Sequence, residues 1–421
     1  MTFTGAVSLG VGAMIGAGIF ALLGEAGSMA GSAVWASFVI GGIVALLTGY
    51  SLGRLGARYP SAGGIVEYLV HGYGNSLFAG AVSVMMYIAA LISLALVAKA
   101  FGSYGAALVG APSWVASVLA VAVMVVFVAI NLRGEASVGR VETWIVLIKF
   151  AVLVTLAVGG LVALKPSLLA PSTYPGTGTI VGSVAVTFFA YAGFRVITNA
   201  AEVVDNPERT IPRAIITAIL LVMALYVVIA VVVFGTLTPA EVAAAKDHAL
   251  AEAARPVFGS AGVVVVSITA LIATASAINA GLFSATNVSY QMAKDGEFPG
   301  IFTHRVRRSR EGLLVSGFLV AVMAVALDLT QVAVLGAITV LVVHASVHIG
   351  HLRVARETGA NRLVVALAAL GALAIVASTL VDSARSNPSV LVIFAAFAAV
   401  AFGGEWALRR FGSKRLAPTV A

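Results

Sequence analysis

Long apolar runs separated by short polar breaks dominate this chain. A helix that crosses a bilayer needs about 20 apolar residues, each adding about 1.5 Å of length. Backbone amides inside hydrocarbon must be hydrogen-bonded within their own segment, so each such run is expected to be a helix. Twelve runs meet this description: residues 5–23, 32–53, 77–105, 114–132, 141–164, 180–200, 212–236, 260–290, 313–329, 333–351, 362–381 and 389–408.

Composition supports the same interpretation, because 61% of the residues are hydrophobic and only 10% are charged. A soluble domain carries roughly 45–50% apolar and about 25% charged residues. The first run has neither a basic leading region nor a small-residue cleavage pattern, so we expect a retained helix and not a signal peptide. The chain is therefore predicted to be an all-α polytopic membrane protein in a lipid bilayer.

The distribution of basic residues predicts the topology. Most of the 25 lysines and arginines fall in alternate loops and in the C-terminal tail, which twelve helices place on one side. The positive-inside rule assigns that side to the cytoplasm, so both termini are expected there, in a multi-pass protein of the cell membrane. Topology thus explains the net charge of +8, and nucleic acid is not expected as a partner.

Two of the runs carry helix-breaking patterns. The first contains the string GVGAMIGAGIF, with four glycines that each cost about 1 kcal/mol relative to alanine in a helix interior. They favour a helix that unwinds near its middle, although small residues also permit close helix packing. The sixth run contains FFAYAGF, in which Gly193 follows a cluster of aromatic residues.

These two runs occupy equivalent places, because each opens a group of five runs. The groups cover residues 5–164 and 180–352, and residues 361–410 form two further peripheral helices. An odd number of helices per group places the second group upside down in the membrane. The sequence therefore predicts a five-plus-five inverted repeat with broken helices 1 and 6, an arrangement typical of a transporter with a midplane substrate site.

The expected breaks would suit a zwitterion. Free amides at the start of a half-helix attract a carboxylate, and unpaired carbonyl groups accept hydrogen bonds from an ammonium group. The candidate amides belong to Gly16, Ala17 and Gly18, and the candidate carbonyls to Met14, Ile15, Phe188 and Phe189.

Charged residues inside the runs are the other candidates for function. Lys149 lies eight residues into the fifth run, about 12 Å from its start, where a charge is costly and by default functional. It could gain and lose a proton during a cycle, or extend its ammonium to the interface. Arg195 directly follows the sixth-run break, and could either pair with Glu202 or line the inner half of a pathway.

Three histidines, His344, His348 and His351, share one face near the end of the tenth run. They could bind a metal, but no carboxylate or thiol joins them and the chain has no cysteine, so no metal or cofactor is expected. An intramembrane enzyme would need convergent catalytic groups, for which this triplet is the only candidate. An enzyme is therefore not expected, nor is a receptor, because no soluble domain is appended.

Several motifs together resemble the amino acid–polyamine–organocation (APC) transporters. They are GVGAMIGAGIF, YSLGRLGARYPSAGG, FFAYAGF running into ITNAAEVVDNPERTIPRAI, and YQMAKDGEFP, and they span nearly the whole chain. Together with VGRVETWIVLIKF, the sixth-run motif looks closest to archaeal proton-coupled transporters of broad amino acid specificity. The resemblance implies that Lys149 stands where sodium-coupled relatives hold sodium, bridging the Gly12 carbonyl to Ser276. The neighbouring Ala275 lacks the second hydroxyl that a sodium site often uses.

The resulting functional hypothesis is secondary active transport of amino acids by alternating access. We expect proton-coupled symport of small or neutral amino acids such as alanine, with an exchanger without net proton coupling as the alternative. No carboxylate stands at the breaks to bind a second ammonium, which argues against cationic substrates and polyamines. The substrate side chain is expected to lie near Gly193, among Met85, Met86, Phe188, Tyr191 and Ile278.

Overall fold

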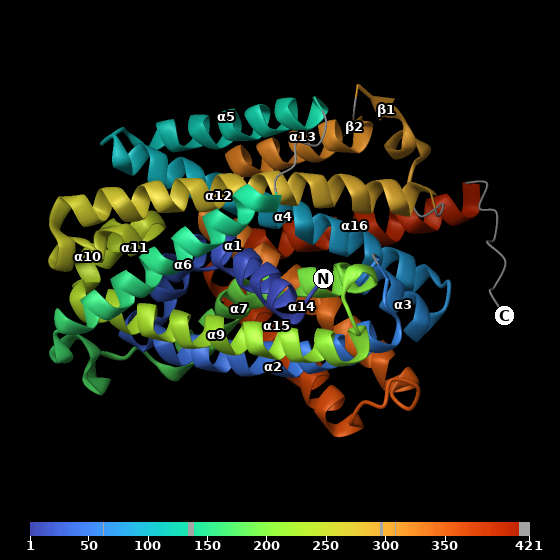
Figure 1. Ribbon diagram of the computed structural model, residues 1–421, viewed down its shortest axis with the longest axis horizontal. Helices are drawn as coiled ribbons and strands as arrows, with labels where there is room; N and C mark the ends of the chain where they lie inside the picture. The colour runs from blue at the N-terminus through green and yellow to red at the C-terminus, as the bar shows by residue number, and fades with distance from the viewer. Residues whose placement is uncertain (62, 134–138, 295–297, 308, 412–421) are drawn as a thin grey trace.

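The computed structural model describes residues 1–421 apart from residues 62, 134–138, 295–297, 308 and 412–421, and the side chains of residues 17, 139–143 and 246. It is almost entirely helical, and the long helices run roughly along one axis (Figure 1). The long helices are α1 (Phe3–Ala30), α2 (Val34–Arg58), α4 (Leu77–Leu108), α5 (Ser113–Leu132), α6 (Gly139–Val162), α7 (Thr177–Tyr191), α9 (Pro207–Thr236), α12 (Arg255–Lys294), α13 (Glu311–Ala326), α14 (Leu329–Val354), α15 (Arg362–Ser386) and α16 (Pro388–Phe411). The short elements are α3 (Ile65–Tyr73), α8 (Val196–Asn199), α10 (Pro239–Ala244), α11 (Ala249–Glu252), β1 (Arg305–Val306) and β2 (Ser309–Arg310).

The helices have the length and composition of membrane spans. Among the described residues, 10 helical stretches are long and apolar enough to cross a membrane, the first of which joins the end of α1 to α2. The first half of α1 and the 16-residue α13 are shorter apolar helices. Each of the twelve apolar runs coincides largely with helix, although the run at 180–200 covers α7, a 3₁₀ segment and α8, and the run at 313–329 extends past the end of α13. The number of membrane crossings stays a prediction.

The predicted break in the first run is not present, because α1 is one continuous helix of 28 residues. Its glycines serve close packing instead. A Cβ added at Gly18 would lie 2.5 Å from the Ala190 carbonyl oxygen, and one at Gly16 would lie 3.1 Å from the Ala277 Cβ. The close packing that these glycines allow between neighbouring helices therefore compensates for the low helix propensity of glycine.

The sixth run does change its conformation where the sequence predicts. Helix α7 ends at Tyr191, a 3₁₀ segment covers Ala192–Arg195, and the short α8 follows. Gly193 in this segment contacts the α1 backbone so closely that an added Cβ would lie 2.7 Å from the Met14 amide nitrogen. The interrupted helix is thus held directly against the middle of α1.

The helices form an enclosed centre and an apolar periphery. Helix α14 is central, because 89% of its apolar 18-residue stretch is buried, whereas only 17% of the corresponding stretch is buried in α5 and in α16. Helices α5 and α13 pack together at one edge (Figure 1) and expose large apolar side chains such as Val125 and Phe318, as expected for surfaces that face lipid. The helix pair α10 and α11 lies at one end of the molecule, and α3 and the β1–β2 hairpin lie at the other.

Candidate functional site

A cavity of about 530 Å³ lies between α1, α4, α6, α12 and the 3₁₀ segment after α7. It reaches the start of α1 and the ends of α5 and α8, so it is placed toward one side of the molecule. Its lining combines apolar helix faces with polar groups that are rare in membrane helices. The polar side chains among the described lining residues are Ser8, Ser93, Asn131, Lys149, Arg195, Asn199, Ser276, Asn279 and Ser284.

Lys149 extends from α6 to the backbone of α1. Its side chain is only 2% exposed, and its Nζ donates a hydrogen bond of 2.6 Å to the Gly12 carbonyl oxygen. Val146 lies about one turn before Lys149 on α6 and packs against the same glycine. A Cβ added at Gly12 would lie 2.7 Å from the Val146 side chain, so the glycine allows α1 and α6 to approach each other. Ser276 of α12 lines the same cavity. The structure thus brings together the three residues predicted for proton coupling, and the coupling itself stays a prediction.

The predicted substrate residues are mostly packed in the core beside this cavity. Met14, Ile15, Phe188, Tyr191 and Ile278 are at most 1% exposed, Phe189 is 6% exposed, and only Gly193 of the predicted set lines the cavity. The side chain of Ala17 lies outside the described part of the structure, and the backbone amides at Gly16 and Gly18 belong to the continuous α1. The amide site predicted for a carboxylate is therefore not formed by an unwound helix.

Two tyrosine hydroxyls in this core donate hydrogen bonds to backbone carbonyl groups of neighbouring helices. Tyr226 Oη donates a 2.7 Å hydrogen bond to the Met14 carbonyl oxygen, and Tyr191 Oη donates a 3.0 Å bond to that of Phe38. At Met14, a neutral hydroxyl group thus binds the carbonyl that the sequence suggested for an ammonium group.

Arg195 projects into the cavity and does not form the ion pair considered from the sequence. Its Nη1 lies 3.4 Å from the Met86 sulfur, a weak acceptor. Within the described residues, no carboxylate lies within 4.0 Å of this guanidinium. The described lining therefore contains two cationic side chains, Lys149 and Arg195, and no carboxylate.

The three histidines of α14 are buried and have different surroundings. His348 and His351 exchange hydrogen bonds of 2.9 and 2.8 Å with Ser51 of α2. His344 is packed between the rings of Phe188 and Phe194, and neither of its ring nitrogens has a hydrogen-bond partner among the described residues. The histidines thus join α14 to α2 and to the aromatic cluster of the interrupted helix.

Two cavity residues were missed from the sequence. Asn131 Nδ2 donates a 2.8 Å hydrogen bond to Asn279 Oδ1 and so connects the end of α5 to α12 at the cavity wall. Both asparagines lie within or at the end of apolar runs, where an amide is costly unless it is paired or faces a cavity. That cost is the signal by which they could have been found.

Comparisons with known proteins agree on the class of this chain. A family model described as amino acid permease matches residues 1–403. The inner membrane transport protein YbaT of Escherichia coli is 36% identical over 359 residues, which cover 84% of each chain. An uncharacterised protein of Methanocaldococcus jannaschii is 36% identical over 86% of this chain and 84% of its own. The serine/threonine exchanger SteT of Bacillus subtilis is 27% identical over 70% of this chain and 68% of its own.

Proposed function

Because the chain belongs to the amino acid permease family of the APC superfamily, we propose that it carries amino acids across the cell membrane by proton-coupled alternating access. Family membership itself makes it a multi-pass transporter for amino acids. The observation that carries the finer proposal is the Lys149 ammonium, buried at a cavity wall and bonded to the Gly12 carbonyl.

Lys149 offers a direct way to couple protonation to helix movement. While protonated, its ammonium makes a charge-assisted hydrogen bond that holds α6 against the first half of α1. Proton loss would weaken that bond and remove the charge, which lowers the cost of separating the two helices. The family's alternating access would then follow the proton, because α1 and α6 both line the cavity.

The packing of the helices supports the predicted inverted repeat. If helices 1–5 exchange with helices 6–10, the contact of α1 with α9 should correspond to a contact of α7 with α2, and both are present. The same exchange relates the contact of α4 with α14 to that of α12 with α6. It also relates α4 packed on α5 to α12 packed on α13. This regularity supports repeats at 5–164 and 180–352, with 361–410 outside them.

The predicted topology indicates the side of the membrane to which the cavity opens. With both termini in the cytoplasm, as the basic loops favour, the ends of α5 and α8 and the start of α1 face the cell interior. The cavity then opens inward, so this conformation would release substrate into the cytoplasm.

The charges of the cavity favour a particular orientation of the substrate. Arg195 would attract the carboxylate of an amino acid, because its guanidinium has no carboxylate partner in the described structure. Two cationic side chains, Lys149 and Arg195, disfavour lysine, arginine and polyamines. We therefore propose small or neutral amino acids such as alanine as substrates.

The competing proposal is obligatory exchange, for which the name of the SteT relative provides a precedent in that protein. Uptake of radiolabelled alanine into vesicles that contain no amino acid separates the two. Symport requires uptake into empty vesicles, whereas strict exchange would give uptake only into vesicles preloaded with substrate.

A further inference from the structure

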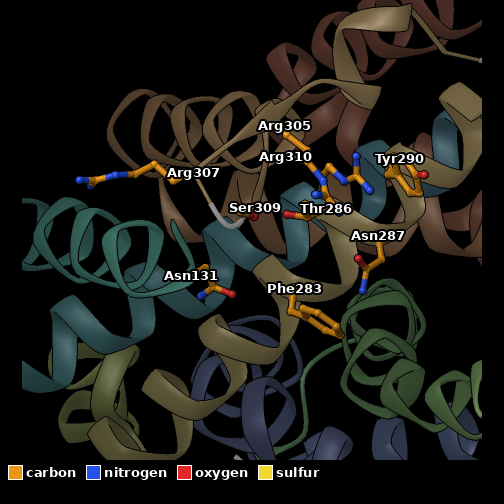
Figure 2. A pocket seen from close by; sticks show the side chains of 9 residues that line it. All are labelled: Asn131, Phe283, Thr286, Asn287, Tyr290, Arg305, Arg307, Ser309 and Arg310. Atoms are coloured by element: carbon orange, nitrogen blue, oxygen red, sulfur yellow. The ribbon is translucent and has the colours of Figure 1, made fainter. Parts of the chain in front are cut away.

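A second pocket, of about 450 Å³, lies beside the inner mouth of the central cavity. It is formed by the end of α5, the last turns of α12 and the β1–β2 hairpin, and it shares Asn131 and Phe283 with the cavity. Figure 2 shows the hairpin arginines above the polar side chains of α12. The residues that matter here are Thr286, Asn287 and Tyr290 of α12 and Arg305, Arg307 and Arg310 of the hairpin.

Two of these arginines are held together by the hairpin register. Arg305 and Arg310 are direct cross-strand partners, a position in which like charges repel. Both side chains extend toward Tyr290, whereas Arg307 extends to the other side of the hairpin (Figure 2). The Arg310 guanidinium lies 4.0 Å from the centre of the Tyr290 ring and donates a 3.0 Å hydrogen bond to the Thr303 carbonyl. The Arg310 side chain is therefore ordered by specific contacts, and the hairpin register places the exposed Arg305 opposite it.

No carboxylate is among the described residues that line this pocket. The neighbouring Glu311 does not line the pocket, and its carboxylate lies 3.4 Å from the His304 ring. The hairpin also has an unusual turn, because Arg307 has a φ of 54°, a left-handed conformation that an arginine adopts only at a cost. A tight turn that holds two guanidinium groups side by side is what a bidentate anion site requires.

We propose that this pocket binds a phosphate group, and that its natural occupant is the headgroup of an anionic phospholipid. Guanidinium groups match phosphate oxygens in pairs, and Asn287 and Thr286 add neutral hydrogen-bonding groups. The source is a lipid because α5 and α13 flank the hairpin with exposed apolar residues, including Ile130 and Leu314. With the predicted topology, the pocket lies at the cytoplasmic leaflet, where anionic headgroups attract basic residues.

This proposal differs from the positive-inside rule in a way that can be measured. Topology needs only positive charge, which lysine supplies equally well. A bidentate site needs the planar guanidinium, so Arg305→Lys/Arg310→Lys should weaken the site while keeping the charge. It is also independent of the proton-coupled transport proposed above, because the readout is binding.

The test is native mass spectrometry of detergent-purified protein titrated with phosphatidylglycerol or with phosphatidylcholine. The parent should retain one phosphatidylglycerol in preference to phosphatidylcholine. Arg305→Gln/Arg310→Gln should lower that affinity by about tenfold or more, because two charge-assisted contacts are lost. The matched control is Arg356→Gln/Arg362→Gln, which removes two exposed arginines elsewhere and should leave the affinity unchanged.

The following outcomes of the binding experiment would overturn the proposal. Equal phosphatidylglycerol affinity in the parent and the glutamine pair would exclude this pocket, and an equal loss in the control pair would show a non-specific charge effect. If inorganic phosphate binds the parent and displaces phosphatidylglycerol at similar concentrations, the occupant is a soluble phosphate and not a lipid. Should the glutamine pair fail to fold, the lysine pair decides, since full affinity in it would exclude bidentate binding.

Discussion

Gly193→Ala tests whether the interrupted helix and α1 are in contact in only some conformations of the transport cycle. A Cβ at this position would lie 2.7 Å from both the Ala13 carbonyl carbon and the Met14 amide nitrogen. Normal carbon contacts are about 3.5–4.0 Å long, so the two backbones would have to separate by about 1 Å. Overpacking of this kind costs about 1–3 kcal/mol. Both sides of the contact are backbone, so no flexible side chain can relieve it.

That cost acts on the conformation with the inward cavity, in which the contact is present. A strain of about 1–3 kcal/mol confined to one conformation shifts its population by about 5–150-fold. The chain has no cysteine, so Ser284→Cys at the cavity wall gives a single labelling site. In this background, Gly193→Ala should slow maleimide labelling and slow alanine uptake, whereas Gly178→Ala, with nothing within 4 Å of its added Cβ, should change neither.

The reasoning would be refuted by a Gly193→Ala protein that labels and transports like Gly178→Ala. It would also be refuted by a loss of thermal stability with unchanged labelling, since that result places the contact in every conformation.

Three further substitutions test separate contacts. Tyr226→Phe removes the hydrogen bond to the Met14 carbonyl and should destabilise the protein by about 0.5–1.5 kcal/mol, measured by thermal unfolding. Arg195→Gln should raise KM for alanine by about tenfold or more with a smaller change in kcat, if the guanidinium binds the substrate carboxylate; an unchanged KM contradicts that role. Arg409→Gln leaves the buried Glu405 of α16 without its 2.6 Å ion pair, so thermal stability should fall while KM stays constant.

The fold was largely predictable because hydrophobic length is a strong signal in a membrane protein. Each apolar run coincides largely with helix, and the run at 260–290 begins where the structure has a kink, at Gly259. The short amphipathic α3 and the β1–β2 hairpin were not predicted. Neither has a long apolar run, and the hairpin turn uses an arginine where glycine or asparagine would have been a recognisable signal.

The candidate site was predictable only where a charge stood out against hydrocarbon. Lys149 is such a residue, and the structure places it at the cavity beside Gly12. The glycines of α1 were misinterpreted as a break, because sequence alone does not distinguish unwinding from close packing against Ala190 and Ala277. The pairing of Asn131 could not be predicted from the sequence, because its partner Asn279 is 148 residues away and only the tertiary fold brings the two together.

The central claim is that Lys149 couples protons to amino acid movement. Its most direct test is radiolabelled alanine uptake into sodium-free proteoliposomes, with and without an inward proton gradient, for the parent and Lys149→Ala. The control is Lys99→Ala, because Lys99 also lies within a long apolar helix but donates to the Ala324 carbonyl, away from the cavity lining. The account predicts gradient-driven accumulation by the parent and by Lys99→Ala, and its loss in Lys149→Ala with alanine binding retained. Gradient-driven accumulation that persists in Lys149→Ala, or uptake by the parent that ignores the gradient, would contradict it.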